Sequence, residues 1–127
     1  QLNGRKLRVS ALRDGGRAIV ATGFPFRYPE LMPRQYAILQ SVLTEIADVR
    51  RLGSASLDLC FVAANRFDGF FEMGLKPWDI CAGILIAQEA GAIVTDLAGG
   101  HTMLDSGNIV AANTYLHNTL LARIAAA

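Results

Sequence analysis

Hydrophobic positions along the chain alternate between short apolar runs and longer stretches with helical spacing. The runs at 6–12 and 17–24 predict two strands, which the turn Arg-Asp-Gly-Gly separates. From 34 to 48 the apolar residues recur at spacings of three and four, which predicts a helix with one apolar stripe. That stripe consists of Tyr36, Leu39, Leu43 and Ile46. The short segment 48–53 that follows is compatible with an edge strand.

The middle of the chain contains a strongly apolar segment followed by an alternating one. Residues 55–65 predict a helix that the Gly-Ser pair just before it introduces. Residues 67–74 alternate as a strand does, with Phe71 on one side and with Phe70 and Glu72 on the other. An acid at the end of this predicted strand precedes the next helix.

The last third of the chain repeats the alternation of helix and strand. A helix is predicted from 79 to about 90, and a glycine follows it as a stop. Strands are predicted at 92–99 and 107–113, and a closing helix at 114–127 with Thr114 as its cap. Because helices and strands alternate, we expect an α/β or α+β fold, in which helices pack on a mixed β-sheet.

Length and composition indicate the number of domains and whether the chain packs against another one. The 127 residues suit one domain, 1–127. The apolar fraction of 52% lies above the roughly 45–50% of an average soluble protein. A small domain has little interior in which to place such residues. We therefore expect the chain to pack on another subunit or to be part of something larger.

Charge, hydropathy and cysteine usage exclude several classes of protein. The net charge of +1 predicts no nucleic-acid partner. No apolar run approaches the ~18 residues of a membrane span, and no signal-peptide pattern opens the chain. The two cysteines, Cys60 and Cys81, are too far apart in sequence for a metal knuckle. We expect both to be reduced core cysteines of a cytoplasmic protein.

Three features can carry chemistry, and each also has a purely structural interpretation. Asp79 precedes an apolar helix, where an acid caps the helix or holds a charged group. Glu72 is either a solvated strand-end acid or a ligand-binding one. The segment 52–56 contains Ser54, which either caps the next helix or helps its free N–H groups to hold a polar ligand. Together these features would lie where α/β sheets bind ligands.

The amino-acid sequence of one long segment indicates a protein family more specifically than these three features do. "GSASLDLCFVAANRFDGFFEMGLKPWDICAGILIAQEAGAIVTDLAGG", residues 53–100, resembles the C-terminal half of the inositol monophosphatase family. The pattern that runs from "WD" to "EAG" is similar to that family's C-terminal signature. The flanking "LNGRKLRVS", "ATGFPF" and "GNIVAAN" are similar too, so that the resemblance covers essentially the whole chain. It implies the C-terminal half of a layered αβαβα fold.

The resemblance also implies an activity and roles for particular residues. Family members are Mg²⁺-dependent phosphomonoesterases, most often acting on inositol 1-phosphate, and are commonly homodimers. Asp79 matches a catalytic metal-ligand aspartate, and Glu72 matches the acid that hydrogen-bonds a sugar hydroxyl. Gly53, Ser54 and Ala55 match the segment that contacts the substrate. These roles agree with chemistry, because Mg²⁺ prefers oxygen ligands and a carboxylate is a good acceptor for a polyol hydroxyl.

The same resemblance shows which acids this chain lacks. In the family, a glutamate pair and an Asp-Pro-(Ile/Leu)-Asp-Gly-Thr segment come from the N-terminal half, and neither occurs here. Asp58 and Glu89 fall within predicted helices, and Asp96 ends a strand, so they do not replace the missing acids. We therefore expect a C-terminal half that is inactive alone and needs the N-terminal half of the same enzyme as its partner.

Several alternatives remain open at this point. The substrate could instead be fructose 1,6-bisphosphate, a nucleotide phosphate or histidinol phosphate on the same fold. The chain could also be a non-catalytic module for dimerisation or protein binding. His101 and His117 have no partner at metal-binding spacing, and we expect a loop residue and a helix-surface residue respectively.

Overall fold

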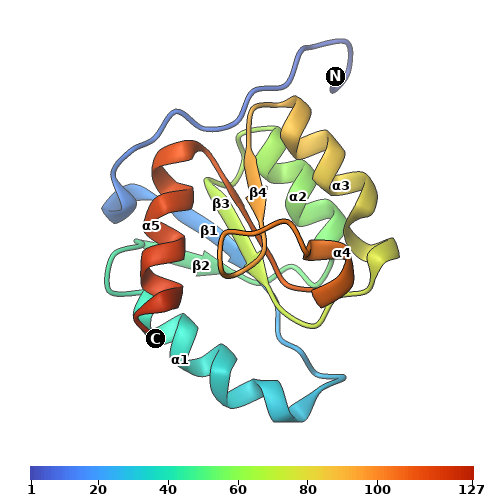
Figure 1. Ribbon diagram of the computed structural model, residues 1–127. Coiled ribbons are helices and arrows are strands. Elements are labelled where there is room, and N and C mark those ends of the chain that lie inside the picture. The colour runs from blue at the N-terminus through green and yellow to red at the C-terminus, as the bar shows by residue number, and fades with distance from the viewer.

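The computed structural model describes residues 1–127 and contains a five-stranded sheet between two layers of helices (Figure 1). In sheet order the strands are β2 (Asp48–Arg50), β1 (Ile19–Thr22), β3 (Gly69–Glu72), β5 (Ile109–Ala112) and β4 (Ile93–Thr95). The first three strands pair in parallel, while β5 pairs antiparallel with both of its neighbours. The predicted mixed sheet with packed helices is confirmed.

The helices divide between the two faces of the sheet (Figure 1). One face carries α2 (Ala55–Ala63), α3 (Pro77–Glu89) and the short α4 (Met103–Ser106). The other face carries α1 (Met32–Val42) and α5 (Thr114–Ala125). Two 3-10 turns, η1 (Gly15–Arg17) and η2 (Pro29–Leu31), complete the fold. The sequence patterns predicted every one of these strands and helices except α4, and η1 overlaps the turn predicted at Arg-Asp-Gly-Gly.

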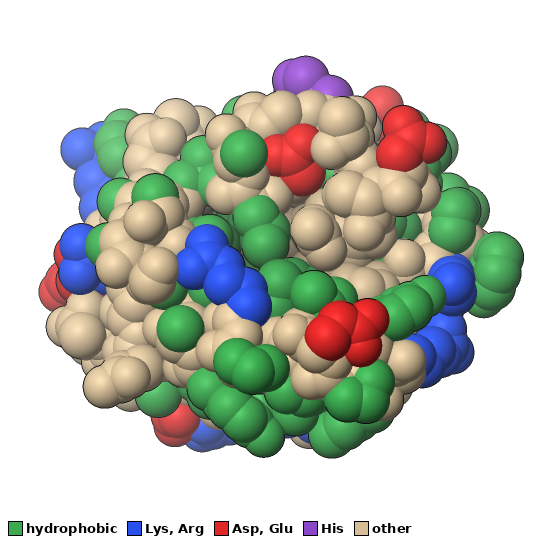
Figure 2. Space-filling model, turned by 60° about the horizontal axis from the view of Figure 1, so that its bottom comes forward, with side chains coloured by type: hydrophobic (Ala, Val, Ile, Leu, Met, Phe, Trp, Pro, Cys, Tyr) green, Lys and Arg blue, Asp and Glu red, His purple; other side chains and the backbone are tan.

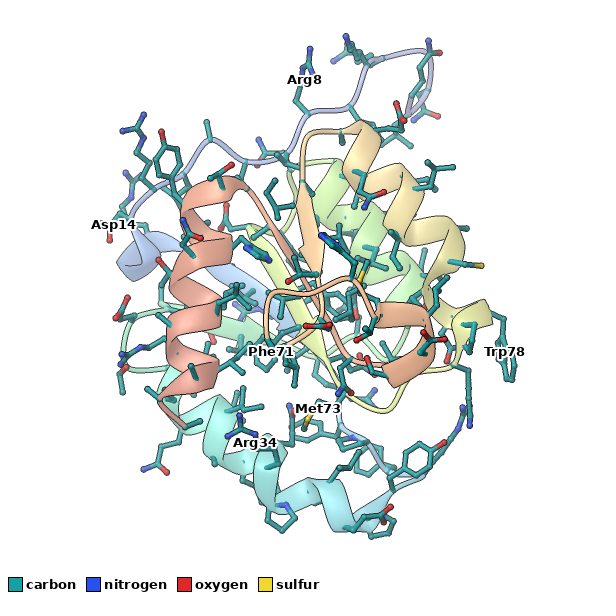
Figure 3. The ribbon with its side chains drawn as sticks, viewed as in Figure 1. Arg8, Asp14, Arg34, Phe71, Met73 and Trp78 are labelled. Carbon is teal, nitrogen blue, oxygen red and sulfur yellow. The ribbon has the colours of Figure 1, made fainter.

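The central strand β3 shows why both helical layers are needed. Phe70 packs in the apolar cluster under α2 and α3, whereas Phe71 packs in the cluster on the other face. Figure 3 shows Phe71 near the middle of the sheet, beside α5. Both rings are fully buried, because a strand in the middle of a three-layer fold has no solvent face.

The apolar stripe predicted for the first helix is wrong for two of its four residues, Tyr36 and Leu43. Leu39 packs against the core and Ile46 is buried, although α1 already ends at Val42. Tyr36 is 57% exposed and Leu43 47% exposed. The buried face of α1 is instead formed by Gln35, Ile38 and Val42. Gln35 is a polar residue that enters the core because its Nε2 donates to Thr22 Oγ1 at 3.3 Å. The spacing of apolar residues therefore identified only part of the buried surface of this segment.

The segment 6–12 is not a strand, although its apolar alternation predicts one. No neighbouring strand pairs with it, and its backbone is held at separate points. The Val9 N–H donates to the carbonyl of Ala90 at 3.0 Å. The side-chain amide of Asn113 donates to the carbonyls of Ser10 and Leu12 at 2.7 and 2.8 Å.

Two helix-end and side-chain predictions also need correction. Asn113, and not Thr114, caps α5, because its Oδ1 accepts the Leu116 N–H at 2.9 Å. His117 is not a surface residue. It is buried with its Nε2 2.8 Å from Thr95 Oγ1, and burial lowers the pKa of its imidazole.

The cysteines are free, but only one is close to the predicted environment. Cys60 is half-buried, whereas Cys81 is exposed on α3, so the prediction of two core cysteines is wrong for Cys81. Its exposure belongs to a wider feature of this helix layer, since other apolar side chains of α2 and α3 also face outward.

Candidate functional site

A cleft of about 340 Å³ lies at the carboxyl ends of the three parallel strands. Parallel strands end at one edge of a sheet, so the segments that leave β1, β2 and β3 meet there. All five residues singled out from the sequence line this cleft: Gly53, Ser54, Ala55, Glu72 and Asp79. The structure therefore brings together residues that are up to a fifth of the chain apart in sequence.

The N-terminal end of α2, residues 53–55, forms one wall of the cleft and is called the helix mouth below. Gly53 adopts a φ of +91°, a backbone conformation that residues with a side chain rarely adopt. This conformation turns the chain from β2 into α2. Ser54 Oγ accepts the Leu57 N–H at 3.4 Å, so Ser54 does cap α2. The same hydroxyl lies 3.3 Å from Ser56 Oγ. Capping and a place in the cleft thus coexist at Ser54.

Asp79 is the third residue of α3. It therefore does not occupy the N-cap position, which belongs to Lys76. Its Oδ2 accepts the Lys76 N–H at 2.9 Å, which is the capping-box bond. No hydrogen bond within the chain engages Oδ1. Lys76 is itself held by its Nζ, which donates to the Tyr28 hydroxyl at 2.6 Å. One carboxylate oxygen therefore orients Asp79 while the other is free to bind a ligand.

Glu72 is a half-buried acid at the end of β3, so the interpretation of a solvated strand-end acid is wrong. Burial, followed by the charge of Asp58, raises the pKa of its carboxyl to about 7. Arg51 acts in the opposite direction, and Asp79 adds a smaller increase. An acid with this pKa exchanges its proton near neutral pH, which is common for groups in ligand sites.

Asp58 is a second unusual acid, located on the buried side of α2. It is fully buried, and neither carboxylate oxygen has a hydrogen-bond partner. Burial raises the pKa of Asp58 to about 6, against a weaker lowering by Arg51. The ionised form is therefore the unfavourable one in the folded chain.

This burial predicts a pH-dependent stability that Asp58→Asn removes. Because the folded pKa is raised, the contribution of Asp58 is fully present below its unfolded pKa and is lost as the pH rises through about 6. We expect the unfolding free energy of Asp58→Asn, measured relative to wild type, to increase as the pH rises. The increase should be on the order of 1–3 kcal/mol between about pH 4 and pH 8. Urea unfolding at several pH values measures this difference.

The control for this prediction is the exposed acid Asp105, changed to Asn in the same way. Its curve should run parallel to that of the wild type. Parallel curves for Asp58→Asn as well would mean that the Asp58 carboxyl is not forced to ionise inside the fold.

The donor set fits one part of a magnesium site. Asp79 Oδ1 is a hard oxygen without an intrachain partner, the kind of ligand that Mg²⁺ prefers. No three His, Cys, Asp or Glu side chains are placed so that they could hold a metal ion together. Asp96 cannot join, because its two oxygens accept bonds from Gly100 and Thr102, and the Thr102 hydroxyl in particular lowers its pKa to about 2. Asp79 thus offers one oxygen that fits Mg²⁺ as a ligand.

Sequence reasoning missed several residues of the cleft. The segment after β1 contributes Gly23, Phe24, Phe26 and Arg27, and the segment after β2 contributes Arg51. Neither segment has a local pattern that indicates binding. Their position directly after parallel strands was the only signal, and it depends on knowing the pairing of β1 with both neighbours.

A small-molecule cleft at the carboxyl ends of parallel strands, with acids and a helix mouth in its wall, defines an α/β protein built around a ligand site. The comparisons with known proteins then identify the family. The chain belongs to the inositol monophosphatase family, whose model matches residues 1–127. The resemblance noted from the sequence is confirmed over its whole length.

The similar proteins include both curated and solved examples. "Nus factor SuhB" of Haemophilus influenzae is 51% identical over 124 residues, which are 98% of this chain and 46% of that protein. The extragenic suppressor protein suhB of Bartonella henselae superposes with a TM-score of 0.91 at 40% identity, covering 96% of this chain and 47% of the other. The inositol monophosphatase of Anabaena gives a TM-score of 0.90 at 34% identity, covering 98% and 49%.

The partial coverage of the relatives limits which of their properties can be assigned to this chain. The chain spans about half the length of the curated relatives that it matches. None of its helices combines the length and apolar character that a membrane crossing requires. The family and the fold are therefore established, while the activity of a whole protein is a matter for proposal.

Proposed function

We propose that this chain supplies the substrate-contacting wall and one metal ligand of a Mg²⁺-dependent phosphomonoesterase that acts on a small phosphorylated polyol, with inositol 1-phosphate as the first candidate. The observation that carries the proposal is the cleft in which Asp79, Glu72 and the helix mouth at 53–55 converge. Membership of the inositol monophosphatase family supports phosphatase chemistry in general.

Each group has a distinct proposed part. Asp79, oriented by the Lys76 N–H, would hold Mg²⁺ through its free oxygen. Bound Mg²⁺ would polarise the phosphate ester and help to activate water. Gly53, Ser54 and Ala55 would contact the substrate through the start of α2. Glu72 in its ionised form would accept a hydrogen bond from a substrate hydroxyl.

The proposal includes a second half, of the kind that the longer relatives have, as the partner of this chain. The outer side of the α2–α3 layer is apolar: Leu57 is 52% exposed, Leu85 is 59% exposed, and Cys81 lies on the same layer. Figure 1 shows these two helices as the outermost layer on their side of the sheet. A helix that is apolar on both sides is normally covered on both sides, so we assign this face to the other half.

Aromatic residues continue this exposed apolar character around the cleft. Trp78 is 73% exposed, and Figure 3 shows it projecting from the start of α3 away from the body of the molecule. Figure 2 shows further hydrophobic side chains, in green, across the lower part of the face it presents. Such surface is compatible with a partner chain, and the homodimer and the cytoplasmic location remain predictions.

A substrate panel tests the proposed specificity. The protein assayed is this chain together with the second half proposed above, which we call the full-length protein. We expect Mg²⁺-dependent phosphate release to be fastest with inositol 1-phosphate. Fructose 1,6-bisphosphate, a nucleotide monophosphate and histidinol phosphate are the comparison substrates. A clear preference for one of these three would replace the polyol phosphate in the proposal while leaving the phosphatase chemistry in place.

A second candidate function is binding within a transcription complex, because the curated relatives carry the name Nus factor. A specific feature favours a binding role: a surface hollow is lined by Arg5, Lys6, Arg8 and Arg66 and by no acid. Figure 3 shows Arg8 pointing outward from the N-terminal segment. A partner with an anionic surface would suit this hollow.

Charge reversal separates this candidate from the catalytic one. We would compare recovery of RNA polymerase complexes by the full-length protein and by its Arg5→Glu, Arg8→Glu double variant, with Arg17→Glu as the control. Loss of recovery with phosphatase activity intact would support a separate binding role. Equal recovery by all three proteins would count against the hollow as the contact.

A further inference from the structure

The buried glycine Gly23 lies directly against the carboxylate of Glu72. Strands β1 and β3 pair in parallel with Thr22 opposite Phe71, so Gly23, the first residue after β1, lies beside Glu72, the last residue of β3. A Cβ atom placed on Gly23 would overlap Glu72 Oε1 and Cδ, and would lie 2.7 Å from Oε2. Glu72 can therefore occupy its place only when residue 23 has no side chain.

The backbone itself does not require glycine at this position. Gly23 is not among the residues with positive φ, so an alanine there would be unstrained. The atoms that its methyl group would meet are the far end of a flexible side chain, which can rotate away. The fold would tolerate alanine at position 23 at little cost, provided that Glu72 moves.

No ion pair or hydrogen bond within the chain fixes the Glu72 carboxylate. The two ion pairs of the structure are Arg50 with Asp48 and Arg123 with Glu45, so Glu72 has no ion-pair partner. Its side chain makes no hydrogen bond within the chain either. Steric contact with the end of β1 therefore limits how far back the Glu72 carboxylate can lie.

We propose that Gly23 is a positioning residue that sets the depth of the cleft: by lacking a side chain, it lets the Glu72 carboxylate lie back against the end of β1 and leaves room for a hydroxyl-bearing substrate in front of it. The inference rests on the proposed function, in which Glu72 accepts a hydrogen bond from a substrate hydroxyl. A methyl group at position 23 pushes the carboxylate into the space that the polyol ring would occupy.

Selectivity between two phosphate esters tests this role in the full-length protein. The substrates are inositol 1-phosphate, which offers hydroxyls, and phenyl phosphate, which offers none. We expect Gly23→Ala to lower the ratio of their kcat/KM values about 10-fold or more, mainly through the KM for the polyol ester. The rate with phenyl phosphate should change much less, because that ester makes no contact with Glu72.

A compensating substitution distinguishes positioning from general damage. Glu72→Asp shortens the acid by one methylene, so the Gly23→Ala, Glu72→Asp double variant should recover selectivity relative to Gly23→Ala alone. Gly16→Ala is the matched control. Its Cβ would also lie close to a carboxylate, 3.1 Å from Asp14 Oδ1, but outside the cleft. It should leave both esters and the melting temperature unchanged.

Three results would overturn the inference. The first is an unchanged selectivity ratio in Gly23→Ala while the wild type prefers the polyol ester, which would refute Gly23 alone. The second is a Gly23→Ala protein that does not fold, since alanine is argued to be tolerated. The third is a wild type that does not distinguish the two esters, which would refute the proposed role of Glu72 and the inference with it.

Discussion

We expect Asp79→Asn to lower Mg²⁺-dependent phosphate release by the full-length protein about 100-fold or more. Loss of a residue that hydrogen-bonds a metal ligand already costs about 10–100-fold, and this substitution removes the charge of the proposed ligand itself. Asparagine keeps an oxygen that accepts the Lys76 N–H, so the start of α3 should form as before. Steady-state kinetics over a range of Mg²⁺ concentrations, together with a melting curve, measures both effects.

The control for this substitution is Glu89→Gln, an exposed acid at the other end of the same helix. It removes an equal charge from α3 but lies far from the cleft. Its activity should match the wild type. If Asp79→Asn retained full activity with an unchanged requirement for Mg²⁺, Asp79 would be a structural acid and the proposed metal role would be wrong.

Gly107→Ala should cause the largest loss of stability of any single added methyl group in the chain, about 2–4 kcal/mol. Gly107 ends α4 with a φ of +73°, which disfavours every side chain. A Cβ there would also overlap the Leu75 carbonyl and lie 2.9 Å from the Leu75 nitrogen. Both atoms belong to the backbone, so no side-chain rotation relieves the contact. Urea unfolding of the variant measures the loss.

Gly99→Ala provides the matched control for Gly107→Ala. Gly99 also has a positive φ, +87°, but the nearest atom to its Cβ would be Leu121 Cδ1 at 3.4 Å, an ordinary contact. We expect a cost of about 1 kcal/mol from the backbone conformation alone. Equal losses for the two variants would mean that the loop between β3 and α3 moves freely around Leu75.

Gly107 also connects this stability effect to the cleft. Its carbonyl accepts the Leu75 N–H at 2.9 Å, and Leu75 lies between Glu72 and Asp79 in the sequence. The loop that separates the two acids is thus held by the end of α4. We expect Gly107→Ala to weaken the binding site as well as the fold.

Local patterns predicted most of the secondary structure, and long-range contacts explain the exceptions. The segment 55–65 and the segment before Gly91 were recognised as helices because each is apolar over several turns. The segment 6–12 has the composition of a strand, but a strand needs a neighbour, and the sheet offers none at that place. Gln35 was missed as a core residue because its partner, Thr22, lies on another element.

The site shows the same division between local and long-range information. Asp79, Glu72 and the helix mouth at 53–55 were singled out because each stands at the end of a recognisable element, and the family resemblance implied a role for each. The contact between Gly23 and Glu72 could not, since it depends on the parallel register of β1 with β3. The unusual state of Asp58 depends likewise on its burial, which the sequence does not reveal because the helix around it is apolar on nearly all sides.

The central claim is that this chain contacts the substrate and supplies one metal ligand but cannot hydrolyse a phosphate ester alone. The most direct measurement is Mg²⁺-dependent phosphate release from inositol 1-phosphate by the 127-residue chain, side by side with the full-length protein. We predict release by the full-length protein and none by the chain alone. Release by the chain alone, abolished by Asp79→Asn, would contradict the claim, because the acids of this chain would then form a complete metal site.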